Sequence, residues 1–268
     1  MEWRNIYRGM IMGIIELVPG ISSGTFAVLL GIYERLIAAI SGITTRHWRK
    51  HIFFLIPLGI GMGISIFSFS HLMSWLLENH AKPTFYFFIG LILGILPFLF
   101  RASKAKATFR FRHIVLLIIG FFLVNQLQII PGSESIIEER NLTIYMMLFV
   151  AGMIGSAMML LPGISGSLVF VVLGVYHTII QAISELELVV IFVVGSGILL
   201  GVLIMSKIID YFFARYRSET FAFVIGLVIG SAFVIFPGWF ETTFQFFLCT
   251  GLFIIGLFIA YIFGKVEY

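Results

Sequence analysis

Charged side chains are scarce in this 268-residue chain, in which only 11% of the residues are Asp, Glu, Lys or Arg. A soluble globular protein carries roughly 25% charged residues. The chain therefore has too few charges to cover a water-facing surface. Its formal net charge of +4 does not indicate a nucleic-acid partner, because the basic residues lie in short loops between apolar segments.

Cysteine is nearly absent as well. The single Cys249 excludes a disulfide within the chain and a cysteine-based metal site. The histidines lie in or near the expected loops, and we predict neither a metal site nor a cofactor. The apolar stretch after Arg8 lacks a small-residue cleavage pattern, so we expect no cleavable signal peptide.

Apolar residues, by contrast, are abundant: 60% of the chain is hydrophobic, and phenylalanine alone occurs 30 times. A helix needs about 20 apolar residues to cross a membrane. Six runs approach or exceed that length, so the sequence predicts an all-α integral membrane protein. The predicted spans cover about 52–77, 85–100, 113–130, 188–213, 221–236 and 244–264.

Two further apolar regions, about 4–41 and 143–184, are each interrupted in the middle by Pro-Gly. They are copies of each other, because residues 19–41 match residues 162–184 at 12 of 23 positions. Both copies begin with Pro-Gly-Ile-Ser and contain Leu-Gly-x-Tyr. Composition alone does not produce aligned motifs of this kind.

The similarity continues beyond these regions, since Gly59 and Gly61 align with Gly195 and Gly197. The chain therefore consists of two repeats, 1–130 and 141–265. Each contains one interrupted hairpin followed by three spans. Internal repeats of this kind are typical of transporters.

The distribution of charge predicts the topology, because basic residues favour cytoplasmic loops. Loops 42–51, 101–112 and 214–219 are mainly basic, whereas segments 131–141 and 185–187 are mainly acidic. If each interrupted region returns to the side from which it entered, all the basic loops and both termini are cytoplasmic. Each repeat then crosses an odd number of times, so the two repeats have inverted topologies.

The length of the first arm favours a hairpin that does not fully cross. Residues 4–18 reach roughly 22 Å as a helix, whereas the hydrocarbon core is about 30 Å thick. We therefore expect re-entrant hairpins and six crossings. Ten crossings remain the alternative, because 145–161 is nearly long enough to span.

The chemistry is expected at the two hairpin tips, which inverted repeats would bring toward each other near the membrane midplane, within one cavity. Proline stops a helix and glycine permits a sharp reversal, so hydroxyl residues then stand at the start of a new helix. Free amides and hydroxyls at a helix start bind anions, phosphate above all. The alternative is a tight turn whose caps are satisfied internally. The expected substrate-binding residues are Pro19, Gly20, Ser22, Ser23, Gly24 and Thr25 in the first tip, and Pro162, Gly163, Ser165, Gly166 and Ser167 in the second.

Two charged residues near the first tip complete the predicted site. Glu16 lies inside an apolar arm, where an ionisable group is a functional hypothesis by default. It either pairs with Arg35 when the site is empty or carries a proton. Arg35 is the basic residue nearest in sequence to the tip and could hold two phosphate oxygens. Capping the broken helix is the structural alternative for Glu16.

The tip residues resemble the two motifs of the polyprenyl-phosphate transporter family. The first motif corresponds to 16–25 (ELVPGISSGT) and the second to 161–167 (LPGISGS), each followed by Leu-Gly-x-Tyr. Ser23 stands where the family would have glycine, and Glu16 where aspartate is commoner. The resemblance implies a bacterial cytoplasmic-membrane flippase that returns undecaprenyl phosphate, or a related lipid, from the outer to the inner leaflet. Coupling to protons or sodium is compatible with it.

Two other functions are weighed against this one. Membrane undecaprenyl-pyrophosphate phosphatases also use inverted repeats and a Pro-Gly-x-Ser turn, but their turn continues with an arginine. This chain has Ser23 and Gly166 after the serine, and one intramembrane glutamate rather than two. These groups are too few to activate a nucleophile and stabilise charge on phosphorus. A membrane scaffold would leave the duplicated tips unexplained. We therefore predict a transporter, not an enzyme.

Overall fold

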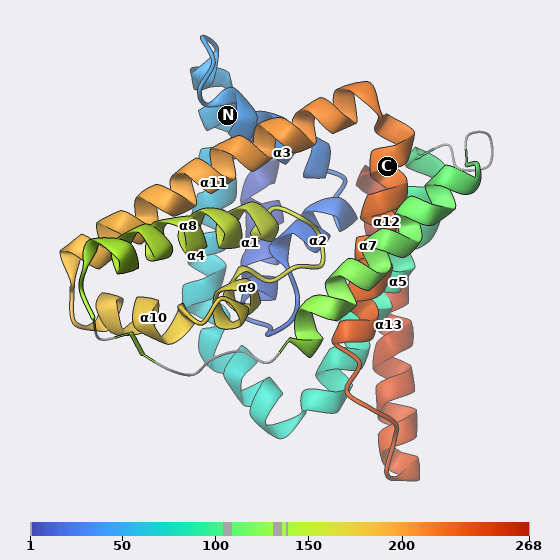
Figure 1. Ribbon diagram of the computed structural model, residues 1–268. Coiled ribbons are helices and arrows are strands. Elements are labelled where there is room, and N and C mark those ends of the chain that lie inside the picture. The colour runs from blue at the N-terminus through green and yellow to red at the C-terminus, as the bar shows by residue number, and fades with distance from the viewer. Residues whose placement is uncertain (1, 104–108, 131–135, 138, 268) are drawn as a thin grey trace.

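The computed structural model describes residues 2–103, 109–130, 136, 137 and 139–267. These residues form twelve helices and no strand (Figure 1). The helices are α1 (Arg4–Glu16), α2 (Ser23–Leu29), α3 (Tyr33–Gly42), α4 (Trp48–Asn79), α5 (Ala81–Ala102), α7 (Phe111–Ile129), α8 (Leu142–Met159), α9 (Gly166–Val172), α10 (Tyr176–Ser184), α11 (Leu188–Arg215), α12 (Arg217–Val234) and α13 (Thr243–Glu267). The prediction of an all-helical protein is confirmed.

Within the described part of the chain, six helices are long and apolar enough to cross a membrane: α4, α5, α8, α11, α12 and α13. Five of them coincide with predicted spans. The sixth predicted span, 113–130, forms the shorter apolar helix α7. Helix α8 was expected as an arm that stops halfway, yet its 18 residues are long enough to span. Helix α1, its counterpart, has only 13 residues.

The second arm of each hairpin is broken into two helices, and this break was not predicted from the sequence. Helices α2 and α3 meet at an angle of 119°, and α9 and α10 at 110°. The first break lies at Gly31, whose φ of +65° is a conformation that favours glycine. Its amide bonds to the Val28 carbonyl, and the next amide, of Ile32, bonds to the Ala27 carbonyl, both at 3.0 Å. This is the Schellman arrangement that ends a helix.

The second repeat contains the same break. Gly174 has a φ of +71°. Its amide bonds to Val171 and the Val175 amide to Phe170, again at 3.0 Å. Leu-Gly-x-Tyr is therefore a helix-ending signal in both copies, and the tyrosine begins the next helix.

Helix pairs recur between the two halves. Helix α1 packs along α4, and α8 packs along α11 in the same way. Glycine allows this close approach, because a Cβ on Gly61 would lie 2.0 Å from the Ile6 carbonyl oxygen. The aligned Gly197 has the same relation to Phe149, at 2.2 Å. Two helices that touch backbone to backbone tolerate no larger side chain there.

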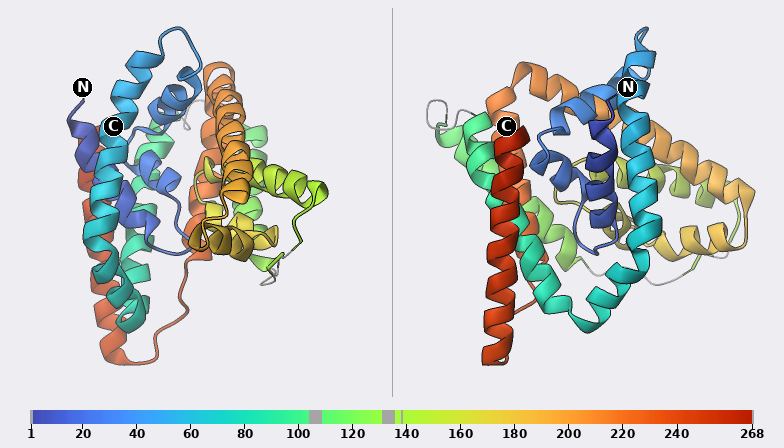
Figure 2. Two further views of the ribbon diagram at one scale, coloured as in Figure 1. Left: turned by 90° about the vertical axis from the view of Figure 1, so that its left-hand side faces the viewer. Right: turned by 180° about the vertical axis from the view of Figure 1, so that it is seen from behind.

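The other two recurring pairs join the halves. Helix α5 of the first half packs along α13 of the second, and α12 of the second packs along α7 of the first. Each half thus places its last helix against the other half. Figure 2 shows α5 beside α13 along most of their length. The main hydrophobic core lies among these helices and the tips.

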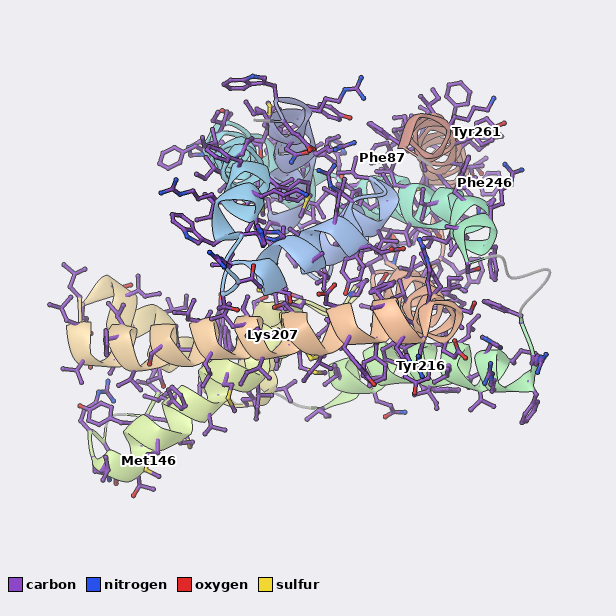
Figure 3. All side chains as sticks on the ribbon, turned by 90° about the horizontal axis from the view of Figure 1, so that it is seen from above. Phe87, Met146, Lys207, Tyr216, Phe246 and Tyr261 are labelled. Atoms are coloured by element: carbon purple, nitrogen blue, oxygen red, sulfur yellow. The ribbon has the colours of Figure 1, made fainter. Side chains whose placement is uncertain are left out.

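The surface around the bundle is apolar. Large side chains such as Phe67, Phe192 and Phe247 are at least 68% exposed. Figure 3 shows that carbon dominates the side chains on the outer faces of the helices. Exposed apolar surface of this extent is incompatible with water and suits lipid. The protein is a multi-pass membrane protein.

Both marked chain ends lie at the top of the molecule in Figure 1, together with the α11–α12 turn. Two ion pairs fasten segments at this end: Arg112 to Glu219 at 2.9 Å, and Arg217 to Glu34 at 2.8 Å. The sequence assigned Arg112, Arg217 and Glu219 to one side of the membrane, and Glu34 belongs to the hairpin that was expected to return to that side. Lys104 and Lys106, which contribute to the basic character of this side, lie outside the described residues.

The segments assigned to the opposite side are also joined to each other. Arg140 bonds both carboxylate oxygens of Glu187 at 2.9 Å, and this hydrogen bonding lowers the pKa of Glu187. Lys82 pairs with Glu241. Every ion pair among the described residues thus joins segments of one predicted side. The acidic residues Glu134 and Glu138 lie outside the described part of the chain.

Candidate functional site

The first tip comprises residues 17–25, between α1 and the start of α2. Gly20 has a φ of +83°, which reverses the chain after Pro19. Ser22 is the N-cap of α2, and its Oγ accepts a hydrogen bond from the Gly24 amide at 3.1 Å. Ser22 and Thr25 are both buried, at 4% and 1% exposure. The hydroxyl groups of this tip are therefore largely used inside the protein.

The second tip comprises residues 160–168 and has the same backbone shape. Gly163 has a φ of +84°. Ser165 is the N-cap of α9, but its side chain makes no capping bond. Instead its Oγ lies 2.9 Å from the Oγ of Ser167, and Ser167 is exposed. Two neighbouring hydroxyls are thus available here to a ligand.

The two tips touch each other. Thr25 Oγ1 of the first tip accepts a hydrogen bond from the Gly163 amide of the second, at 2.7 Å. Tyr33, at the start of α3, donates its hydroxyl to the Leu160 carbonyl at 2.8 Å. Gly24 also lies against the second tip, since a Cβ on it would be 3.6 Å from Pro162 Cα. The prediction that the tips lie together is confirmed.

The tips are nonetheless in closed contact, whereas we expected hydroxyls facing a shared cavity. For Ser22 and Thr25 that expectation is wrong in this conformation, because one oxygen caps a helix and the other binds the opposite tip. Ser23 is half-buried, and Ser165 and Ser167 remain accessible. The sequence could not distinguish these cases, since the same hydroxyl residue serves a cap or a ligand depending on what lies opposite.

The symmetry of the contact is incomplete, and the sequence explains why. Leu168 occupies the position in the second tip that corresponds to Thr25, so no equivalent bond to Gly20 can form. Tyr33 is fully buried by the contact, whereas the corresponding Tyr176 is half-buried. The first tip is sealed and the second is partly open.

Neither tip contains a lysine or an arginine. Helices α2 and α9 have only seven residues each, so few peptide dipoles add up at their starts. An anion bound here would rely on hydroxyl and amide hydrogen bonds. The tips suit a polar, charged group that must be held and released.

Glu16 is the last residue of α1, and its side chain is exposed. A carboxylate at this end of a helix meets the negative end of the helix dipole. Among the described residues no ion pair reaches it, so the expected pair with Arg35 is not formed. Met159 occupies the corresponding place in the second repeat and is 40% exposed.

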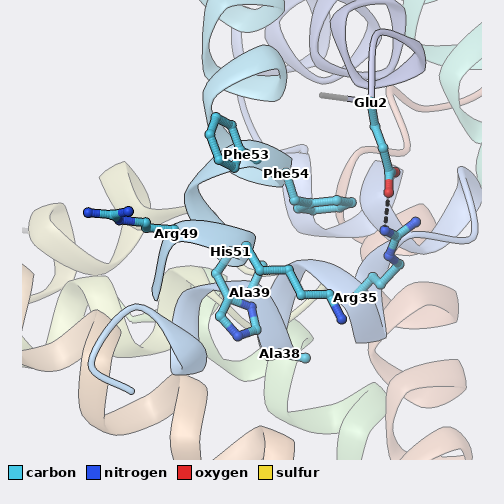
Figure 4. A pocket seen from close by; sticks show the side chains of 9 residues that line it. Glu2, Arg35, Ala38, Ala39, Arg49, His51, Phe53 and Phe54 are labelled. Carbon is cyan, nitrogen blue, oxygen red and sulfur yellow. Dashed lines mark hydrogen bonds and ion pairs between the residues drawn. The ribbon is translucent and has the colours of Figure 1, made fainter. Parts of the chain in front are cut away.

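Arg35 lies away from the tip contact, in a basic pocket at the end of the molecule that carries the N-terminus. It pairs with Glu2 and lies over the Phe54 ring, 4.8 Å from its centroid (Figure 4). The Arg35 hydrogen bond lowers the pKa of Glu2. The pocket has a volume of about 610 Å³, and its lining includes Arg49, Lys50 and His51. The structure therefore does not bring Arg35 to the tips, and its predicted contact with phosphate there is not supported.

Sequence reasoning missed the part that Tyr33 plays in the site. The tyrosine was recognised only as part of a repeated motif. The signal was its position directly after the helix-ending Leu-Gly, at the start of α3, from which its hydroxyl reaches the opposite tip. No pattern within one repeat identifies Leu160 as its partner, because the bond forms between repeats.

A multi-pass helical protein whose broken helices meet inside the bundle has the architecture typical of a secondary transporter. The chain belongs to the undecaprenyl phosphate translocase-like family, whose model matches residues 12–247. This confirms the family resemblance of the tip motifs, both of which fall within the matched region.

Two relatives give the same picture. The chain is 40% identical over 275 residues to a protein of Staphylococcus aureus (strain NCTC 8325 / PS 47) named polyprenyl-phosphate transporter, covering 99% of this chain and 97% of the relative. It is 32% identical over 257 residues to a protein of Vibrio cholerae serotype O1 with the same name, covering 90% and 80%. Both are named as transporters and neither as an enzyme, in agreement with the predicted class. No solved structure matches the chain.

Proposed function

We propose that this protein transports undecaprenyl phosphate, or a closely related polyprenyl phosphate, from the outer to the inner leaflet of a bacterial cytoplasmic membrane. The names of two relatives support the lipid class. The observation that carries the proposal is the contact between the two tips, where Thr25 of one repeat holds the Gly163 amide of the other at 2.7 Å. A contact between two like halves is a place where a passage can be closed and opened.

The proposed arrangement in the membrane has two inverted repeats with re-entrant hairpins and both termini in the cytoplasm. Three observations support it. Helix α1 is too short to cross. The ion pairs join only segments of one predicted side. The basic loops share their side with the chain ends, as positively charged cytoplasmic loops do.

In this mechanism the phosphate binds where the second tip offers Ser165 and Ser167, whose hydroxyls lie 2.9 Å apart. Separation of the tips breaks the Thr25–Gly163 bond and frees that amide for the phosphate. Hydrogen bonds to a charged group contribute on the order of 1.5–3 kcal/mol each. Glu16, exposed at the end of α1, is placed to carry a proton with the lipid.

Purified protein in liposomes tests the proposal. Undecaprenyl phosphate is supplied in one leaflet, and its arrival in the other is measured with an impermeant phosphate-binding probe. We expect faster arrival of the intact lipid than in protein-free liposomes. The same preparation receives undecaprenyl pyrophosphate. Release of free phosphate from the pyrophosphate lipid, without movement of the monophosphate lipid, would show that the protein is an enzyme and not a transporter.

A further inference from the structure

Two apolar grooves flank the tips, one in each half of the molecule. The first, here called the α4–α5 groove, has a volume of about 420 Å³ and lies among α1, α2, α4, α5 and α13. The second, the α11–α12 groove, has a volume of about 600 Å³ and lies among α7, α11, α12 and the second tip. Of the residues that join the two tips by hydrogen bonds, only Tyr33 also lines a groove, the second one.

Part of the lining of the two grooves comes from corresponding residues of the two repeats. The aligned glycines Gly59 and Gly195 differ by 136 positions, and the same shift relates six lining residues of one groove to six of the other. From α5 and α12, the matched pairs are Thr84 with Thr220, Phe87 with Phe223, and Phe88 with Val224. A pair of surface depressions formed by chance would not share its lining in this way.

The match extends to the other walls. Met73 and Leu76 of α4 correspond to Ile209 and Phe212 of α11, and Leu252 of α13 corresponds to Leu116 of α7. The two threonines also make the same kind of hydrogen bond: Thr84 and Thr220 each donate to the carbonyl four residues earlier, at 2.8 Å. The groove is therefore a feature of the repeat unit and occurs twice.

Each groove begins beside the tips, and the two reach turns at different ends of the molecule. The α4–α5 groove contacts α2 at Phe26 and Leu29 and reaches toward the α4–α5 turn; Ile259 and Phe263 of α13 also line it. The α11–α12 groove contacts the second tip at Leu161 and reaches Tyr216 at the α11–α12 turn. Figure 1 shows these turns at opposite ends, and Figure 3 shows Phe87 and Tyr216 well apart.

The chemistry of the lining fits one kind of occupant. Glu219 is the only charged residue that lines either groove among the described residues, and Arg112 pairs with it at 2.9 Å. The remaining walls are aliphatic and aromatic. A lipid whose phosphate lies at the tips must place its chain beside them, and each groove extends the tip region with an apolar channel.

We infer that the two grooves are alternative binding sites for the polyprenyl chain of the transported lipid, one used on each side of the membrane. The inference rests on the proposed function and adds a site that the tips do not explain. Burial of the chain gives little net gain, because membrane lipid is as apolar as the groove. The grooves therefore act through shape, and distinguish a methyl-branched prenyl chain from straight acyl chains.

A photoreactive lipid tests the inference. The probe is a polyprenyl phosphate carrying a diazirine in its chain, and the control is a phosphatidic acid carrying a diazirine in an acyl chain. Both have a phosphate head. Wild-type protein in liposomes is labelled with each, and the adducts are located by mass spectrometry. We expect prenyl adducts in both the 73–88 and 209–224 segments, and few around the lipid-facing Phe192, which is 77% exposed.

Two results would overturn the inference: prenyl adducts spread evenly over the lipid-facing helices, or an identical pattern from the phosphatidic acid. Transport of undecaprenyl phosphate is measured on the same liposomes. Transport without groove labelling would show that the grooves do not bind the chain, and the proposed function would be unaffected. Absence of transport with this lipid would contradict the proposed function itself.

Matched substitutions give a second test. Thr84→Trp and Thr220→Trp each place a large ring in one groove, and Phe192→Trp is the control on the outer face of α11. We expect transport to fall about tenfold or more in each groove variant, because the ring occupies the space that the chain needs, and to stay unchanged in the control. If a tryptophan variant does not insert, labelling of the wild-type protein by the two photoreactive lipids decides. Unaltered transport in both tryptophan variants refutes the inference.

Discussion

The two tips have the same backbone and different chemistry. Both turn at a glycine with a φ near +83°, at Gly20 and Gly163. In the first tip the hydroxyls of Ser22 and Thr25 are buried and bonded within the protein, whereas in the second Ser165 and Ser167 are accessible. One copy of a duplicated element has thus become structural, and the other has kept free groups. Duplication supplies the shape, and later substitution assigns the roles.

The largest difference between the tips should appear on substitution of their glycines. Gly163 is buried, and a Cβ on it would lie 2.7 Å from the Leu227 carbonyl oxygen, whereas Gly20 is only half-buried. Both alanines also cost about 1–2 kcal/mol for the left-handed backbone. We expect Gly163→Ala to unfold at a much lower temperature and to lose transport. Gly20→Ala should show only the smaller loss. Equal thermal shifts in detergent would mean that the tips are equally packed.

The serines should separate binding from stability. Ser165→Ala combined with Ser167→Ala removes two free hydroxyls, and we expect affinity for the lipid phosphate to fall about 10- to 100-fold. Thermal stability should hardly change. Ser22→Ala removes a helix cap and should lower stability by about 1 kcal/mol with little effect on affinity. Titration calorimetry and thermal unfolding measure the two quantities. If Ser22→Ala lowered affinity and the Ser165/Ser167 double variant lowered stability, the first tip would be the one that binds phosphate.

The bond between the tips can be removed alone. Thr25→Val keeps the shape and leaves the Gly163 amide without its acceptor, which should cost about 1–3 kcal/mol. Thr25→Ser keeps the hydroxyl and is the control. Because the lost bond holds the tips closed, we also expect more exchange of the Gly163 amide with deuterium in the valine variant. Unchanged exchange would show that other contacts keep the passage shut.

The smallest effect on the protein itself is expected at Glu16, which the second repeat replaces by Met159. Glu16→Gln keeps shape and hydrogen bonding but cannot titrate. Stability should be unaltered, because the side chain is exposed. If Glu16 carries a proton, transport in the variant no longer responds to a pH gradient, while lipid binding persists. A wild-type pH response would assign coupling to another group.

Much of the fold could be predicted because the signals are local. Apolar run length located the spans, and the Pro-Gly motifs located the tips. The break at Gly31 is equally local, but Leu-Gly-x-Tyr was recognised only as a repeated motif, and Gly31 was not recognised as the end of a helix. Its φ of +65° shows that it ends a helix. The length of α8 exceeded the estimate drawn from the shorter α1.

The site was harder to predict because its bonds join residues far apart in sequence. Thr25 and Gly163 are 138 positions apart, and Tyr33 and Leu160 are 127 apart. Arg35 was chosen because it is near the tip in sequence, but the bend between α2 and α3 directs that helix toward Glu2 and Phe54. Proximity along the chain is a poor guide across a bend of 119°.

The absence of lysine and arginine from both tips has a consequence for the response to membrane voltage. A phosphate monoester carries nearly two negative charges at neutral pH. Each charge moved against a potential of 100 mV requires about 2.3 kcal/mol, so inward movement into a negative cell interior requires about 4–5 kcal/mol for the lipid alone. A cation on a tip that moves with the lipid would offset part of that charge during the translocation step. With hydroxyls and amides only, we expect the proposed inward transport to slow as the voltage rises unless protons or other cations accompany each lipid.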